Sequence, residues 1–415
     1  MLSVCIYLQV HQPYRVRKYR VFDIGESSDY FSADDESNLN NKRVLQKVAG
    51  KAYRPANAIL LELLHRHPEF RASFSFSGVV LEQMEQYDQE TLNSFRELVE
   101  TGRVEILSET YHHSLAFFYD RAEFERQVTQ HRALIERLFG VTPKIFRNTE
   151  LAYTNELAHW AERAGYNGIL AEGWDHVLGW RSPTFLYQPK GTSRIKALLK
   201  HYRLSDDIAF RFSNRDWHGW PLSADTFANW VHAHHGDGNT VNLFMDYETF
   251  GEHQWEDTGI FEFLRHLPQA ILAHPETGFK TPSEVLNAYT AIGEFDVPHI
   301  LTWADTERDL SAWTGNDMQR SAIEDVYALG AAVLKSGDED LIEDWRKLQT
   351  SDHFYYMCTK WSSDGDVHAY FNPYETPYDA YISYRNALED VRLRAERAGT
   401  HSKPYMARLV GGLSD

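Results

Sequence analysis

The stretch Val241–Trp255, VNLFMDYETFGEHQW, decides the fold prediction. It begins as an apolar run typical of a buried strand and ends abruptly in two acids, Asp246 and Glu248. A strand that is apolar along its length and acidic only at its C-terminal end places charge at the edge of a sheet. Barrels of alternating strands and helices build their active sites at that edge. The stretch therefore predicts a barrel strand that carries functional acids.

The rest of the chain repeats a rhythm of strand followed by helix, which implies parallel pairing. Seven strands are predicted, at Ser3–Val10, Phe70–Phe76, Val104–Leu107, Lys144–Phe146, Gly168–Leu170, Ile195–Leu199 and Val241–Met245. Helices are predicted between them, at Ala56–His65, Val79–Glu100, Ala122–Phe139 and Asn155–Gly165. This count fits an α/β fold, an incomplete (β/α)7 TIM-like barrel.

Two regions differ from this rhythm. Residues 173–239 hold many Trp, Gly and Pro residues, and we expect long loops there. After residue 309 the sequence has helix-period apolar positions, with helices predicted at Asp317–Ser336, Glu339–Ser351 and Tyr378–Ala398. We therefore predict a barrel domain over residues 1–308 and a C-terminal helical subdomain over 309–415, packed on the barrel because no flexible linker separates them.

Composition limits the partners and the location of the protein. The chain has 415 residues and a formal net charge of -18, which would repel nucleic acid and anionic lipid. Only Cys5 and Cys358 are present, too few for a disulfide framework. The N-terminal run has no basic region and is too short to span a bilayer, so we expect a cytoplasmic protein without membrane contact. The sequence carries no signal for an oligomeric state.

Polar residues follow five of the predicted strands, so we expect them to meet at one rim of the barrel. A single acid at a strand end can instead cap the next helix or pair with an arginine, but five such clusters together indicate a functional site. The clusters are His11–Pro13, Glu105–His113, Arg147–Glu150, Glu172–Asp175 and Asp246–Glu248.

Glu150 and Asp246 are the pair best suited to cleavage of a glycosidic bond, which requires two carboxyl groups. Arg147 can hold Glu150 ionised, as a nucleophile needs. Asp246 emerges from the most apolar strand, where loss of solvent would raise its pKa, as a proton donor needs. The alternative for Glu150 is capping of the helix that begins near Asn155.

Five segments, in order, resemble the five motifs of glycoside hydrolase family 57, in its α-amylase-like branch. They are HQPY, GRVEILSETYHH, FRNTELAYTNE, MDYETFGEHQW and TWADTERDLSAWTGN, and they span about residues 9 to 319. The resemblance implies an incomplete (β/α)7 barrel followed by helices. It also implies an enzyme that cleaves or transfers α-glucans with retention of configuration.

Carried over by motif, the resemblance assigns Glu150 as the nucleophile and Asp246 as the general acid/base. The motif positions that surround the sugar in the reactive subsite match His11, Glu105, Glu248 and Asp305. One departure is the segment around Glu150, where Asn148-Thr149 and Leu151-Ala152 replace the aromatic residues, including a nearby Trp, of many members.

Further substrate contacts are expected from residues near the strand ends. Gln12 follows His11, and one of the adjacent His112 and His113 must point away from the barrel axis, so only one is expected to contact sugar, with His112 the candidate. Aromatic rings can stack on pyranose rings or simply fill the core. The candidate aromatic residues are Trp174, Trp255 and Trp303.

The predicted reaction is a double displacement through a covalent glycosyl-enzyme, which requires carboxyl groups about 5 to 5.5 Å apart. Water as acceptor gives an α-amylase-type hydrolase acting on starch, glycogen or maltooligosaccharides, and a glucan acceptor gives a 4-α-glucanotransferase. Two other hypotheses are a metal-dependent carbohydrate deacetylase or mannosidase-like barrel, and a non-catalytic glucan-binding protein. No cofactor or catalytic metal is predicted, although acidic loops such as 236–238 could hold structural calcium.

Overall fold

The computed structural model describes residues 1–401, and the chain forms two compact units. The first unit contains Met1–Pro13, Lys42–His113 and Ala122–Leu310. The second contains the described residues from Ser311 onward together with two earlier segments, Tyr14–Asn41 and Ser114–Arg121. Residues 402–415 of the predicted helical subdomain lie outside the described residues.

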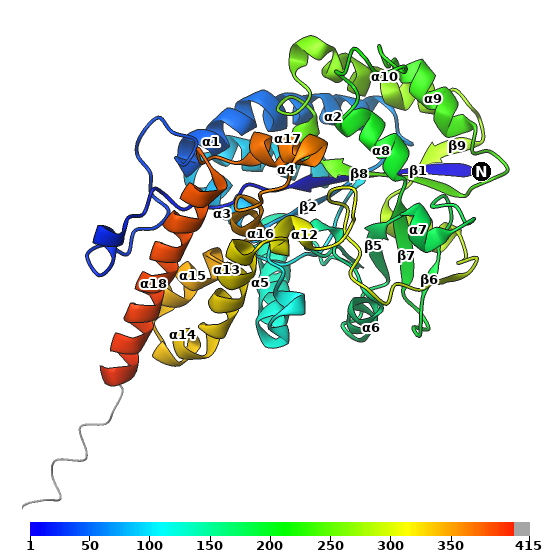
Figure 1. The fold of residues 1–415 in the computed structure, drawn as a ribbon. Helices are drawn as coiled ribbons and strands as arrows, with labels where there is room; N and C mark the ends of the chain where they lie inside the picture. Colours follow the sequence, from blue (N-terminus) through cyan, green and yellow to red (C-terminus); the bar gives the residue numbers. More distant parts are fainter. Residues whose placement is uncertain (402–415) are drawn as a thin grey trace, which may run out of the picture. The chain divides into compact units, whose positions relative to one another are not determined.

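Seven parallel strands form the centre of the first unit (Figure 1). One sheet has the order β3-β2-β1-β8, and a second has the order β4-β5-β7. A parallel bridge between Ser108 and Phe146 joins the two sheets. The strands are β1 (Leu2–Val10), β2 (Ala72–Phe76), β3 (Val104–Ile106), β4 (Ile145–Phe146), β5 (Gly168–Glu172), β7 (Lys196–Lys200) and β8 (Thr240–Asp246).

The barrel closes without a complete ladder between its last two strands. β7 and β8 meet through single hydrogen bonds, such as that from the His201 backbone N–H to the Asn242 carbonyl, 2.8 Å. A short strand, β9 (Thr277–Phe279), pairs with the start of β1 on the same side as β2. β6 (Gln188–Pro189) pairs with β10 (Glu294–Phe295), and the preceding Tyr187 forms an antiparallel bridge to Ala197 of β7. The spatial order of the seven strands follows the chain, so the predicted incomplete (β/α)7 barrel is confirmed.

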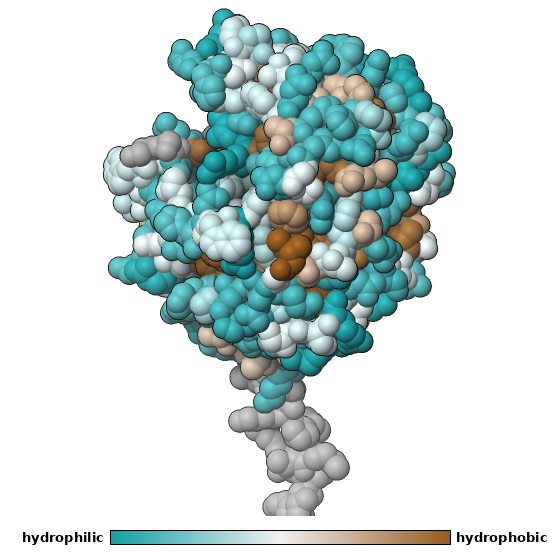
Figure 2. Space-filling model, turned by 90° about the vertical axis from the view of Figure 1, so that its right-hand side faces the viewer, coloured by the Kyte–Doolittle hydropathy of each residue, from teal (hydrophilic) through white to brown (hydrophobic). Residues whose placement is uncertain are grey.

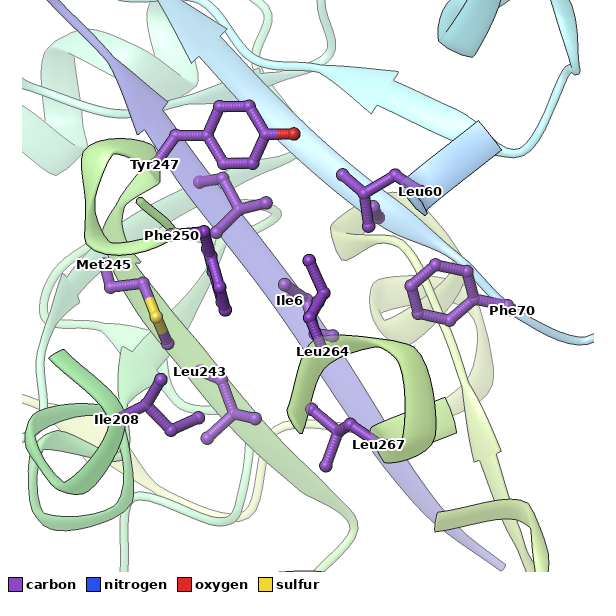
Figure 3. Close-up of a pocket in the computed structure, with 12 residues that line it drawn as sticks. Ile6, Leu60, Phe70, Ile208, Leu243, Met245, Tyr247, Phe250, Leu264 and Leu267 are labelled. Atoms are coloured by element: carbon purple, nitrogen blue, oxygen red, sulfur yellow. The ribbon is translucent and has the colours of Figure 1, made fainter. Parts of the chain in front are cut away.

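The central strands are apolar because helices cover their outer side. All nine residues of β1 are buried, and β8 is buried from Thr240 to Met245 and half-buried at Asp246. Figure 3 shows Ile6, Leu243 and Met245 facing the helices. The cavity that these and nine other residues line has a volume of only about 20 Å³. Apolar lining and such a small volume identify a packing defect of the core rather than a ligand site.

Ten of the first unit's helices are longer than one turn. Their bounds are α1 (Asn41–Val48), α2 (Arg54–Arg66), α3 (Gly78–Tyr87), α4 (Gln89–Glu100), α5 (Arg121–Phe139), α6 (Asn155–Arg163), α8 (Tyr202–Ala209), α9 (Ala224–His232), α10 (Ile260–Leu272) and α11 (Pro282–Ala288). A single turn, α7 (Asp175–Leu178), follows β5. Residues 173–239, predicted as long loops apart from one strand, thus also contain α7, α8 and α9.

The prediction of one helix over Val79–Glu100 was wrong, because the chain breaks at Asp88. There the backbone leaves the helical region (φ -156°, ψ 69°), and the Asp88 carboxylate accepts the Thr91 backbone N–H at 3.1 Å. Arg54 of α2 pairs with the same carboxylate at 2.7 Å. The apolar periodicity continues through the break because α3 and α4 both pack on the barrel, so periodicity alone cannot locate it.

The second unit is helical. Its helices are α12 (Ser311–Thr314), α13 (Asp317–Ala328), α14 (Gly330–Ser336), α15 (Glu339–Lys347), α16 (Ser351–Tyr355), α17 (Ser362–Phe371) and α18 (Pro377–His401). The helix predicted over Asp317–Ser336 divides at Leu329, and a Cβ on the following Gly330 would lie 2.9 Å from the buried Trp345 ring. The close approach of Trp345 therefore requires glycine there.

The surface in Figure 2 is mostly hydrophilic, with apolar residues in small separate patches. This agrees with the excess of acidic residues, 60 against 42 basic ones. Among residues 1–401, no helix has the length and apolar character needed to cross a bilayer.

Candidate active site

Polar side chains from β1, β3, β4 and β8 meet where these strands end. In the sheet register, Gln9 of β1 lies opposite Ser75 of β2 on one side and Asp246 of β8 on the other. The Gln9 side chain donates to Glu109, which follows β3, at 3.1 Å. The C-terminal edge of the barrel therefore gathers charged groups around Gln9, as expected for parallel strands.

Glu150 lies in a short 3₁₀ turn, Thr149–Leu151, directly after β4. Its Oε1 lies 3.0 Å from His113 Nε2, and its Oε2 accepts the Trp303 indole N–H at 2.8 Å. Burial raises the pKa of Glu150, but the His113 hydrogen bond and the nearby positive charges of His113 and Arg147 outweigh it, so the pKa lies below its ordinary value. The Glu150 carboxylate is therefore held ionised.

Trp303 is fixed beside Glu150 by the backbone. The segment Leu301–Trp303 runs antiparallel to Glu150–Tyr153, with hydrogen bonds between Tyr153 and Leu301 in both directions. Two cations lie over the Trp303 ring, Arg147 at 5.1 Å and Lys200 Nζ at 5.3 Å from the ring centroid. These contacts fix the indole ring that hydrogen-bonds Glu150.

Arg147 is fully buried and acts as an internal counter-ion. Its Nη1 lies 3.8 Å from Glu109 Oε2, and its charge lowers the pKa of Glu109, Glu150 and Asp246. Within residues 1–401, its guanidinium has no hydrogen-bond acceptor, so this ion pair and the Trp303 ring are its main electrostatic contacts. The arginine predicted to keep Glu150 ionised therefore acts at a distance.

Asp246 has the opposite pKa shift. Burial and the negative charge of Glu150 raise its pKa to about 6, although Arg147, His113 and Lys200 act in the lowering direction. The influence of Glu150 means that the two carboxyl groups belong to one electrostatic cluster. Because one is held ionised and the other retains a proton more readily, the pair has the asymmetry that general acid catalysis with a nucleophile requires.

Glu248 lies two residues beyond Asp246 and is buried. Its Oε1 accepts a short hydrogen bond from the Tyr53 hydroxyl and a longer one from Gln12 Nε2, 3.4 Å. Burial and the Asp246 charge raise the pKa of Glu248 to about 8, against the lowering effect of these two donors. Of the acids Glu150, Asp246 and Glu248, Glu150 is therefore the one most readily ionised.

A second network of buried charges flanks Trp303 on the Lys200 side. Glu172, at the end of β5, accepts from Arg308 at 2.9 Å and lies 3.8 Å from Lys200 Nζ. Lys200 also donates to Asp206 at 3.0 Å. Burial of Lys200 is tolerated because two carboxylates surround it, and its charge in turn lowers the pKa of Asp246.

Backbone strain is concentrated at this rim. Within residues 1–401, five non-glycine residues have positive φ. They are His113 (50°), Glu150 (58°), Leu151 (49°), Asp305 (55°) and Arg308 (51°). Such conformations cost free energy in L-residues and persist where the surrounding structure imposes them, which is common at functional sites.

The family model for glycosyl hydrolase family 57 matches residues 5–298, which include the strands and acids described above. The chain belongs to glycosyl hydrolase family 57. The predicted family and the prediction of a glycoside hydrolase are therefore confirmed.

Curated relatives and solved structures agree with this assignment. A Methanocaldococcus jannaschii protein described as "Putative alpha-amylase" is 43% identical over 394 residues, covering 92% of this chain and 82% of that protein. The 4-alpha-glucanotransferase of Thermococcus litoralis is 21% identical over 61% of this chain and 38% of its own. The family 57 branching enzyme of Pyrococcus horikoshii shares the fold, with a TM-score of 0.64, 15% identity and coverage of 88% of this chain and 87% of its own.

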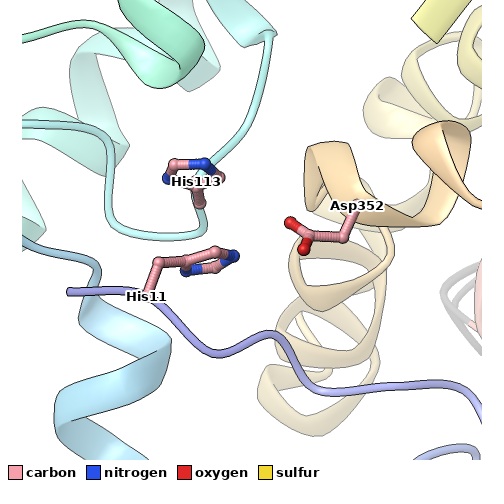
Figure 4. Close-up of side chains that lie close together, drawn as sticks. All are labelled: His11, His113 and Asp352. Carbon is pink, nitrogen blue, oxygen red and sulfur yellow. The ribbon is translucent and has the colours of Figure 1, made fainter. Parts of the chain in front are cut away.

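Several residues predicted from the family 57 motifs come together in the structure. Glu150, Asp246, Trp303, Glu248 and Gln12 belong to the contacts described above. His11 joins them, because its ring stacks on that of His113 with centroids 3.9 Å apart (Figure 4). The His11 Nδ1 lies 2.7 Å from Ser77 Oγ.

Other predicted residues lie elsewhere. Glu105 lies level with Ser73, before the end of its strand, and accepts from the Ser283 backbone N–H at 2.9 Å and from the Ser283 hydroxyl, at the start of α11. It therefore takes the helix-capping role that was the alternative for a strand-end acid. His112 is fully buried against the Tyr111 ring, 4.8 Å away, and the structure brings His113 rather than His112 to Glu150.

The remaining predicted residues are at or near the surface. Trp174 is half-buried against His176, with ring centroids 4.5 Å apart. Trp255 is 57% exposed and lies under Lys51 Nζ, 5.4 Å from its ring. Asp305 is half-buried in the loop after Trp303. None of these three has a described contact with Glu150 or Asp246 within residues 1–401.

Sequence reasoning missed two residues that touch the predicted nucleophile or its partner. The sequence prediction names His112 rather than His113 as the substrate contact, and it assigns no role to Glu109. Glu109 and His113 are four residues apart after a strand, and this spacing is a signal in the sequence that the two belong together. The spacing does not predict the turn that brings both side chains toward Glu150. Lys200 and Arg308 were also missed, because isolated cations in a sequence give no indication of burial.

Proposed function

We propose that the protein is a retaining glycoside hydrolase that cleaves α-1,4-glucans by double displacement, with Glu150 as nucleophile and Asp246 as general acid/base. The observation that carries the proposal is the opposite pKa shift of two electrostatically coupled carboxyl groups, Glu150 lowered and Asp246 raised to about 6. A retaining glycosidase requires this division of protonation between its two acids.

In the first step, the Glu150 carboxylate attacks the anomeric carbon while Asp246 transfers its proton to the departing glycosidic oxygen. The bond from the anomeric carbon to that oxygen breaks, and an ester bond to Glu150 forms. Trp303 N–H and His113 already hydrogen-bond Glu150, so its orientation is set before substrate arrives.

In the second step, Asp246 removes a proton from the attacking water or sugar hydroxyl. Ester formation removes the negative charge of Glu150, which is one of the causes that raise the pKa of Asp246. The pKa of Asp246 therefore falls once the glycosyl-enzyme has formed, so Asp246 ionises and is available as the base that the second step needs. The same residue can thus act as acid and then as base.

Substrate binding is assigned to the polar and aromatic residues around this pair. Glu248, with a pKa raised to about 8, can donate a hydrogen bond to a sugar hydroxyl near neutral pH. Gln12 lies beside Glu248, and His11 lies beside His113. Arg147 supplies buried N–H donors, which in proteins are normally satisfied by water or ligand. The half-buried Trp174, near the end of β5, offers a ring face for sugar stacking.

The α-glucan class rests on the relatives, because the similar proteins are named "Putative alpha-amylase" and "4-alpha-glucanotransferase". The second name supports a 4-α-glucanotransferase as the alternative function. Both reactions use the same nucleophile and acid/base and differ in whether water or a glucan hydroxyl attacks the glycosyl-enzyme.

Product analysis on maltoheptaose and starch tests the proposal. We expect only products shorter than maltoheptaose, released first as the α-anomer, which proton NMR of the anomeric signals would detect. A ladder of products longer than maltoheptaose would instead identify transfer, and release of the β-anomer would rule out retention.

The pH dependence of kcat/KM should follow the two carboxyl groups in the free enzyme. Glu150 must be ionised, so activity should fall as the pH drops below its lowered pKa. Asp246 must be protonated, so activity should also fall as the pH rises through about 6. We therefore expect a bell-shaped profile with its optimum on the acidic side of neutrality, measured with a soluble maltooligosaccharide. A profile that stays level from pH 5 to pH 8 would contradict the role of Asp246.

A further inference from the structure

Glu109 and His113 form a buried pair next to Glu150 that the reaction steps above do not use. We propose that this pair is a positioning device, in which Glu109 holds the His113 ring as an imidazolium and His113 holds the Glu150 carboxylate ionised and oriented. The inference rests on the proposed role of Glu150 as nucleophile, and neither residue is assigned a contact with substrate.

The hydrogen-bond geometry requires a doubly protonated ring. His113 Nδ1 lies 3.2 Å from Glu109 Oε2, and its Nε2 lies 3.0 Å from Glu150 Oε1. An ionised carboxylate can only accept hydrogen bonds, and a neutral imidazole has a single N–H. Both contacts can be hydrogen bonds at the same time only if both ring nitrogens carry protons.

Glu109 is itself held as an anion. It is fully buried, accepts from Gln9 at 3.1 Å and lies 3.8 Å from the buried Arg147. Burial raises its pKa, but the His113 hydrogen bond and the Arg147 charge lower it to about 2. The carboxylate that anchors His113 therefore stays ionised across the whole working pH range.

The ring of His113 has little freedom to move. Its side chain is 3% exposed, its backbone is in the left-handed region, and its ring stacks on His11 at 3.9 Å with 18° between the planes. Within the first unit, the charged or titratable groups that act on it are Glu109, Glu150, Asp246 and His11, with Arg147 and His131 acting through Glu109. Burial lowers the pKa of His113, yet the two carboxylates raise it to about 9.

The variant His113→Asn tests the device through the pH profile. The asparagine retains a neutral donor but removes the charge that lowers the pKa of both Glu150 and Asp246. We expect both limbs of the kcat/KM profile to move to higher pH, by about one unit or more at the acidic limb. Loss of one charge-assisted hydrogen bond should lower kcat/KM at the optimum by about ten- to hundredfold.

The control is His201→Asn, which removes another buried imidazole from the first unit. His201 begins α8, where its Nδ1 accepts the Leu204 backbone N–H at 3.3 Å, and burial lowers its pKa to about 4. Within residues 1–401, it has no described contact with Glu150 or Glu109. We expect its loss to lower thermal stability and to leave both limbs in place. Equal limb shifts in the two variants would show that packing, not the His113 charge, is responsible.

Nitrogen NMR of the histidine side chains gives an independent measurement on the unmodified protein. We expect both His113 nitrogens to be protonated at pH 7, and Glu109→Gln to lower the titration midpoint of His113 by about one unit or more. A neutral His113 at pH 7 would overturn the inference. Activity of Glu150→Gln separates the two proposals: if that variant remains active, the nucleophile assignment fails, whereas an inactive Glu150→Gln with unshifted limbs in His113→Asn refutes only the positioning device.

Discussion

Glu150→Gln is expected to lower kcat/KM by about 10⁴-fold or more, the largest effect of any single substitution in the chain. The amide is a poor nucleophile, so no ester with the anomeric carbon can form. The fold should survive, because Gln is nearly isosteric and its side chain can still accept the Trp303 N–H that now binds Oε2 at 2.8 Å. The measurement is initial rate on maltoheptaose together with mass spectrometry of the protein after rapid quenching.

Glu123→Gln is the matched control for this experiment. Glu123 is also a buried glutamate with an ion-pair partner, but it lies on α5, where it pairs with Arg126 at 3.2 Å and accepts from Gln127. We expect its kcat/KM to stay within about threefold of the parent, since distant surface or helix contacts do not act on the reacting atoms. If Glu150→Gln kept comparable activity, another carboxylate would have to be the nucleophile.

The sequence predicts well those parts of the fold in which a single physical cause determines the residue pattern. The seven strands are recognisable because helices cover their outer faces, so each strand is a short apolar run such as Val241–Met245. The break at Asp88 and the division at Leu329 are not recognisable in the same way, because both halves of each helix bury an apolar face. Their positions depend on a partner distant in sequence, Arg54 at the first and Trp345 at the second.

The candidate site shows the same limit at the level of single residues. The positions of Glu150 and Asp246 at the strand ends are predictable, because Glu150 follows one buried strand and Asp246 ends another. Glu105 also sits in such a strand, yet it caps α11, since a carboxylate within the sheet can reach Ser283 but not the rim. The choice between His112 and His113 depends on the left-handed backbone at His113, φ 50°, which turns its ring toward Glu150 and which the sequence does not specify.

Asp246→Asn is expected to lower kcat/KM on maltooligosaccharides by about 10²- to 10⁴-fold, the range for loss of a general acid/base. The amide cannot donate a proton to the glycosidic oxygen or remove one from water, so both chemical steps should slow. The alkaline limb of the pH profile, which we assign to a pKa of about 6, should disappear with the carboxyl group. Asp225→Asn, an exposed position on α9, provides the matched control and should retain the parental rate and profile.

The leaving group separates the two roles of Asp246. An aryl α-glucoside with an acidic phenol needs no proton to depart, so Asp246→Asn should form the glycosyl-enzyme from it at a rate close to that of the parent. Hydrolysis of that ester still needs a base, so the variant should release a burst of phenol and accumulate a covalent adduct on Glu150. Azide attacks without a base, and its addition should restore turnover and yield the α-glycosyl azide. A variant that is equally slow on aryl and sugar leaving groups, with no adduct, would show that Asp246 has a binding role rather than an acid/base role.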